Sequence, residues 1–354
     1  MLTMPAVWTD ECLAHEPSAE IWLGVRTPGT EVPARATVLR DAVVAAGARL
    51  VPARPHGDEV LVSVHDPAFL EHLEGVYAAW ERAGFPADPG QDRVVPYVFP
   101  TPAMLGGMAA RLPAALHART GWYCYDTMTL VGPGTWRAAR AAVDVALTAV
   151  DLVVAGAPVA YGICRPPGHH ATRDGYGGSC YLNNAAVAAE AFRRAGMARV
   201  AIIDVDAHHG NGTQALFYHR SDVVYASLHV DPGAGWFPHF FGFADETGTG
   251  GGVGHNHNAP VPPGSGDEVW LDALTTLCEV AGRGSPDAVV VSLGVDAAQD
   301  DPESPLRVSH AGFSGAGALI SAFGVPTVVV QEGGYHLPTL GSLTVSFLSA
   351  FAKQ

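Results

Sequence analysis

The chain has 354 residues, of which 48% are hydrophobic, enough to bury the core of one large α/β domain or of two smaller ones. Its 20 Lys and Arg residues face 35 Asp and Glu residues, and the net charge of −15 repels nucleic acid and favours small cationic partners. No apolar stretch reaches membrane-spanning length and residues 1–17 do not resemble a signal peptide, so we expect neither a membrane nor a nucleic-acid partner.

Helical patterns alternate with apolar, β-branched runs in the second half of the chain, most clearly from Val200 onward. This rhythm is typical of a mostly parallel sheet with helices on both faces. In chain order we predict a helix over 136–156, a strand over 159–164, a helix over 184–196, strands over 199–206 and 222–229, a helix over 267–282, a strand over 288–294, a helix over 309–323 and a strand over 325–332.

Two segments, 84–113 and 232–266, are rich in Pro and Gly and have no clear periodicity. Long loops of this kind inside a compact domain are usually functional or mobile. No repeat and no sharp shift in composition marks a boundary, so we predict a single domain over 1–354.

Polar residues gather where the predicted strands end, which is where ligand sites form in open α/β sheets. The four clusters are 165–170 (RPPGHH), 204–212 (DVDAHHGNG), 294–302 (GVDAAQDDP) and 333–335 (GGY).

A metal site is the first prediction from these clusters. Asp206 and His208 lie two residues apart at the end of an extended segment, so both side chains can point toward one ion. Asp296 leaves another strand end and is the candidate third ligand, and three protein ligands leave a position open for water and substrate. Two carboxylates and one imidazole suit zinc and also tolerate ferrous iron.

Acid and base groups are expected beside this metal. His169 and His170 follow a Pro-Pro-Gly turn, and imidazole can accept or donate a proton near neutral pH. Asp204 could orient one of these histidines, and Asn211 the other. Tyr335 follows two glycines, so its hydroxyl could reach a substrate carbonyl and complete an oxyanion site.

Five cysteines are widely spaced and contain no CxxC pair, which argues against a disulfide framework and indicates a reducing cytoplasm. Cys180 lies in a motif-rich stretch, and we interpret it as a buried structural thiol in preference to a nucleophile.

Taken together, the motifs resemble the histone deacetylase superfamily, and within it the bacterial acetylpolyamine amidohydrolases. The segments that carry the resemblance are RPPGHH, GYGGSCYLNNAAVAA, DVDAHHGNGTQALFY, SLHVDP, FPHFFGFADETGTG, SLGVD and EGGY. The resemblance implies a three-layer fold of the arginase/deacetylase type. It also implies the same roles for the metal ligands, the histidine pair and Tyr335.

Further residues are assigned by the resemblance alone. It implies a structural potassium ion held by Asp204, Asp206, His208, Ser227 and Leu228. It also implies a narrow substrate tunnel, with Gly178, Tyr181 and Gly333 in its wall. The loops over 84–113 and 232–266 are expected to wall its entrance and to mediate contacts in a homodimer.

Substrate choice is where the sequence departs from the polyamine-specific members. His117 and Met128 occupy the positions where we align their glutamates, and Asn211 stands where many deacetylases have aspartate, which makes the histidine that it orients less basic. We therefore leave acetylpolyamines and acetyl-lysine side chains open as substrates.

The sequence-based hypothesis is a zinc-dependent deacylase that releases acetate and a free amine from a linear N-acylated amine. Two alternatives remain open. A two-metal ureohydrolase of the arginase type would need further carboxylate ligands, and a non-catalytic protein that binds acylated amines would show no turnover.

Overall fold

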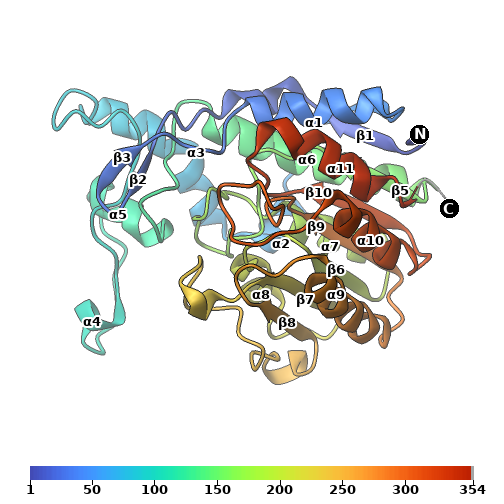
Figure 1. Cartoon of the computed structure of the whole chain (residues 1–354). Helices are drawn as coiled ribbons and strands as arrows, with labels where there is room; N and C mark the ends of the chain where they lie inside the picture. Colours follow the sequence, from blue (N-terminus) through green and yellow to red (C-terminus); the bar gives the residue numbers. More distant parts are fainter. Residues whose placement is uncertain (352–354) are drawn as a thin grey trace.

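The computed structural model describes residues 1–351 and contains one eight-stranded sheet in which every neighbouring pair of strands is parallel (Figure 1). From one edge to the other, the strands are β4 (Arg49–Pro52), β1 (Pro5–Trp8), β5 (Val159–Gly162), β10 (Thr327–Gln331), β9 (Ala288–Leu293), β6 (Val200–Asp204), β7 (Val223–Val230) and β8 (Asn256–Val261). A separate antiparallel hairpin pairs β2 (Glu20–Trp22) with β3 (Val25–Thr27).

Two hydrophobic cores lie on opposite faces of this sheet, because successive side chains of a strand point to opposite sides. On β9, Val290 belongs to one core, whereas Val289 and Val291 belong to the other. Both faces are therefore buried, which is why the central strands are continuous apolar runs with no polar alternation.

Helices cover both faces and make the outer layers (Figure 1). Helices α3, α6 and α7 supply the first core, and α1, α9, α10 and α11 supply the second. The helices are α1 (Ala34–Ala45), α2 (Leu61–Val64), α3 (Pro67–Arg82), α4 (Pro102–Leu105), α5 (Leu116–Tyr123), α6 (Thr135–Val154), α7 (Asn184–Arg194), α8 (Asn211–Phe217), α9 (Asp267–Gly282), α10 (His310–Ser321) and α11 (Leu337–Leu348).

The alternation predicted for the second half of the chain is confirmed, with boundaries within two residues in most elements. The segment 84–113 contains only the single-turn helix α4, as its composition suggested. The segment 232–266 differs from the prediction, because it includes strand β8. β8 has the sequence NHNAPV and pairs only with β7, and a strand at the edge of a sheet tolerates polar residues and a proline.

The part of the segment 84–113 around α4 extends away from the body of the molecule in Figure 1. Met104 and Met108 on this segment are exposed, with 64% and 72% of their surface accessible. None of the described helices combines the length and the apolar character that a membrane crossing requires.

Candidate metal centre and active site

The four predicted polar clusters meet at the carboxyl ends of the central strands. They follow β5, β10, β9 and β6, which are consecutive neighbours in the sheet, and all four strands point the same way. Ligand sites in open α/β sheets form at the carboxyl ends of the strands. The topology therefore gathers residues that are up to 170 positions apart in the chain, such as Arg165 and Tyr335.

The predicted ligands Asp206, His208 and Asp296 face one another. One ligand atom from each lies within 4.8 Å of the others. His208 Nδ1 lies 3.1 Å from Asp296 Oδ2 and 3.3 Å from Asp206 Oδ1. The backbone N–H of Ala207 donates to Asp296 at 2.8 Å, and that of Gly333 donates to Asp206 at 2.8 Å, so both carboxylates are fixed in direction.

The donor set fits a divalent cation. Both carboxyl groups are fully buried, and burial together with the charge of Asp206 raises the pKa of Asp296 to about 7. Two buried carboxylates repel each other, and a cation between them removes that repulsion. Small residues leave space here, because a Cβ on Gly294 or Gly333 would lie only 2.1 or 2.4 Å from a carboxylate oxygen.

His169 is paired with a carboxylate. Its Nδ1 lies 3.0 Å from Asp204 Oδ2, which also accepts a hydrogen bond from the Tyr225 hydroxyl at 3.0 Å. Burial opposes the charged imidazolium, but the charges of Asp204 and Asp206 outweigh it and raise the pKa of His169 to about 10. His169 is therefore suited to hold a proton.

His170 is paired with a neutral amide. Its Nδ1 lies 2.8 Å from Asn211 Oδ1, so Nδ1 carries the hydrogen and Nε2 is left with a lone pair. Burial and the neighbouring His169 and His208 lower the pKa of His170 well below its usual range. The pKa values of the two adjacent histidines are thus shifted in opposite directions, and His170 is the neutral one, with Nε2 free to accept a proton.

Tyr335 lines the same cavity as His170 and His208. Burial raises the pKa of its phenol well above the usual value, so it keeps its proton at neutral pH. The side chain can therefore donate a hydrogen bond to an oxygen in the cavity.

The cavity has a volume of about 270 Å³ and connects these groups to the surface. Gly178 lies in its wall, as expected, and Met128 does too. The Tyr181 hydroxyl donates to the carbonyl of Leu130, and the assignment of Tyr181 to the tunnel wall stays a prediction. Gly333 donates its N–H to Asp206, and its place in the tunnel wall likewise stays a prediction.

Two acidic side chains in this wall, Glu20 and Glu303, were not singled out from the sequence. Burial and the charge of Glu303 raise the pKa of Glu20 to about 7. His117, which aligns with one of the glutamates expected in polyamine-specific members, packs instead against Phe85 and Tyr97, outside the cavity. Glu20 comes from the hairpin and Glu303 from the loop after β9, and no sequence motif links these positions.

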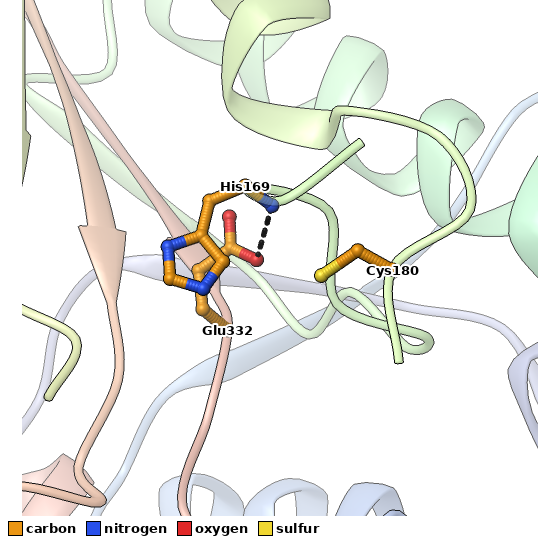
Figure 2. Close-up of side chains that lie close together, drawn as sticks. All are labelled: His169, Cys180 and Glu332. Carbon is orange, nitrogen blue, oxygen red and sulfur yellow. Dashed lines mark hydrogen bonds between the residues drawn. The ribbon is translucent and has the colours of Figure 1, made fainter. Parts of the chain in front are cut away.

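A second group of ligand-type side chains, His169, Cys180 and Glu332, lies close together in Figure 2. Glu332 already accepts hydrogen bonds from the backbone N–H groups of Gly168 and His169, at 2.6 and 3.2 Å. Burial raises the pKa of the Cys180 thiol well above its usual value, whereas a metal needs the thiolate. This group fits a metal less well, and Glu332 instead braces the tandem histidines. The sequence signal for this role of Glu332 was a charged residue at the end of the apolar strand 325–332.

The residues assigned to potassium are also neighbours. Asp204 on β6 lies opposite Ser227 on β7 in the sheet register, and Leu228 follows it. The Ser227 hydroxyl is 2.8 Å from His229 Nδ1. The end of β6 and the second half of β7 therefore lie side by side, which a potassium site formed by residues from both strands requires.

Comparison with known proteins agrees with this geometry. The family profile described as the histone deacetylase domain matches residues 30–351. The chain is 40% identical over 352 residues to acetylpolyamine amidohydrolase 1 of Pseudomonas aeruginosa, covering 98% of this chain and 99% of that protein. It is also 40% identical over 352 residues to the acetylpolyamine amidohydrolase of Mycoplana ramosa, covering 99% of this chain and all of that protein.

The fold is also similar to that of a solved structure. The crystal structure of an acetylpolyamine aminohydrolase from Burkholderia pseudomallei superposes with a TM-score of 0.91 at 38% identity, covering 99% of this chain and 98% of that chain. The expected three-layer arginase/deacetylase fold is thereby confirmed.

Proposed function

The chain belongs to the histone deacetylase family, and we propose that it is a zinc-dependent amidohydrolase that removes the acetyl group from small cationic acetylated amines. The observation that carries this proposal is the buried group of Asp206, His208 and Asp296, of which His208 lines a cavity together with His170 and Tyr335. We assign the whole of 1–354 to one catalytic domain.

Asp206, His208 and Asp296 would hold the ion. When bound, zinc supplies Lewis acidity that polarises the amide carbonyl and makes water a better nucleophile near neutral pH. Ferrous iron would satisfy the same ligands. The backbone N–H groups that bind both carboxylates keep the ligands in place before the ion arrives.

The histidines divide the proton transfers between them. His170 Nε2 accepts the proton that attacking water loses, because its Nδ1–H is already donated to Asn211. His169, whose positive charge Asp204 stabilises, donates a proton to the departing amine nitrogen. The Tyr335 hydroxyl donates a hydrogen bond to the carbonyl oxygen as negative charge develops on it.

Glu20 and Glu303 support a cationic substrate. They lie in the wall of the same cavity as His170 and Tyr335, and they can attract an ammonium group at the far end of an acylated aminoalkyl chain. Acetylpolyamines and the acetyl-lysine side chain both fit this description. The relatives described above are named for acetylpolyamines, and we propose these as the preferred class.

A substrate panel tests the proposal. The zinc-loaded protein is assayed with acetylputrescine, acetylspermidine, an acetyl-lysine peptide and longer acyl chains, and acetate release is measured. We expect the acetylpolyamines to have the highest kcat/KM. No acetate from any substrate, in protein with one zinc per chain, would refute the hydrolase and favour a binding protein. Two metals per chain would favour the ureohydrolase.

We also propose the structural potassium site and a homodimer. The register of Asp204 and Ser227 supports the former. The exposed Met104 and Met108 on the projecting segment 84–113 support the latter, because exposed apolar side chains on an extended segment are typical of protein contacts. Sedimentation equilibrium and the stability of the protein with and without potassium would test these two points.

A further inference from the structure

The loop after β10, residues 332–336, is bonded from both sides by buried charged groups. On one side, the Arg35 guanidinium on α1 donates to the carbonyl oxygens of Glu332 and Gly334 at 2.7 and 2.6 Å, and its carbon lies 4.6 Å from the centre of the Tyr335 ring. On the other side, Asp301 Oδ2 accepts from the backbone N–H groups of Tyr335 and His336, at 2.6 and 3.1 Å.

Asp301 is buried, with 7% of its surface exposed. Its second oxygen, Oδ1, accepts from the backbone N–H of Glu303 at 3.1 Å, so this side chain bonds three backbone groups in two segments. Burying a carboxylate is costly unless hydrogen bonds compensate. None of the proposed metal ligands among the described residues has a hydrogen bond to Asp301, although the charge of Asp301 contributes to the raised pKa of Asp296. The hydrogen bonds of Asp301 therefore act on the Tyr335 loop and on its own turn.

The loop has a reason to need such support. Gly333 and Gly334 precede Tyr335, and Gly334 has a φ of 119°, a conformation that glycine adopts freely. Two successive glycines leave the following peptide free to rotate unless its polar groups are bonded. Arg35 fixes the carbonyl of Gly334, and Asp301 fixes the N–H of Tyr335 at the same peptide unit.

We propose that Asp301 is a positioning residue for catalysis: it holds the backbone of Tyr335 and His336 so that the phenol of Tyr335 faces the carbonyl oxygen of the bound amide. This inference rests on the role of Tyr335 in the proposed function. Displacement of a catalytic group by about 1 Å costs on the order of a hundredfold in rate, so a side chain outside the cavity can control turnover through this loop.

Asp301→Asn tests the inference with almost no change in shape. The amide has one acceptor oxygen, so either the Tyr335 side or the Glu303 side must face an NH₂ group in place of an acceptor. Asp300→Asn is the matched control, because Asp300 is the exposed neighbour in the same turn and loses the same charge. Both variants are made in the wild-type and in the Tyr335→Phe background.

The expected result is non-additive. In the wild-type background, Asp301→Asn lowers kcat by about 10- to 100-fold, with KM and zinc content nearly unchanged. In the Tyr335→Phe background, the same substitution lowers kcat by less than about threefold. Asp300→Asn has no effect in either background. Equal losses in both backgrounds, or loss of zinc from Asp301→Asn, would overturn the proposal, because the residue would then act elsewhere in the site.

Amide hydrogen exchange supplies a readout that does not depend on activity. We expect faster exchange at the amides of Tyr335 and His336 in Asp301→Asn and unchanged exchange in Asp300→Asn; unchanged exchange in both would overturn the proposal. If Asp301→Asn does not fold, Asp301→Glu, which keeps both oxygens but shifts them by one methylene, enters the same cycle. Turnover by the wild-type protein, measured first, separates failure of the proposed hydrolase function from failure of this inference.

Discussion

The centre and the mouth of the cavity are built differently. In the centre, Asp204, Asp206 and Asp296 are at most 1% exposed, and each has a specific hydrogen-bond partner. At the mouth, Trp22 is 52% exposed, and the wall there comes from loops and the β2–β3 hairpin. Electrostatic interactions are stronger in a buried site than in one open to water. We therefore expect the centre to determine the reaction and the mouth to determine substrate choice, with a smaller effect of each side chain at the mouth.

Removing a ligand at the centre has the largest expected effect. Asp296→Ala deletes one of the two carboxylates proposed to hold the ion, and we expect loss of both bound metal and hydrolysis. Elemental analysis and an acetate-release assay measure these two quantities. Asp300→Ala, four residues further along in an exposed position, is the control and should keep both. Retained activity in metal-verified Asp296→Ala would refute the metal site.

The second-largest effect is expected from removing the phenol hydroxyl of Tyr335. Tyr335→Phe removes one donor to the developing oxyanion, and we expect kcat to fall by about 100- to 1000-fold with metal content unchanged. Tyr181→Phe is the matched control, because its hydroxyl donates to Leu130 and not into the cavity. A comparable loss of turnover in Tyr181→Phe would show that the effect of Tyr335→Phe is not specific to a hydroxyl that faces the cavity.

The centre was predictable from the sequence, and the mouth only in part: Gly178 and the segment 232–266 supply lining residues, as expected, whereas Glu20 was not foreseen. Strands such as 288–294 are recognisable because burial on both faces demands an apolar run, and parallel topology then brings Asp206 and Asp296 to one edge without further information. Glu20 reaches the cavity from a short hairpin, and away from the mouth the buried Arg35 bonds Glu332 across 297 positions. Such contacts depend on how loops and helices pack, and no local spacing encodes them.

The histidine pair allows a comparison within the centre. Asn211→Asp would place a carboxylate beside His170 Nδ1, as Asp204 stands beside His169, and stabilise the imidazolium. We therefore expect the pKa of His170 to rise. Because the base must be unprotonated, the acidic limb of the pH profile of kcat/KM then moves to higher pH. An unmoved limb would contradict the role of His170 as the base.

The smallest effect is expected at the mouth. Glu303→Gln removes one half-buried carboxylate from the cavity wall, and we expect KM for acetylputrescine to rise by about two- to fivefold at unchanged kcat, the scale of a partly screened ion pair. N-butylacetamide, which lacks the ammonium group, should bind both forms equally, and the difference should shrink at high salt. Asp300→Asn, outside the cavity, should leave both substrates unaffected. If KM rises as much for the neutral substrate as for the cationic one, Glu303 shapes the cavity wall and does not recognise the charge of the substrate.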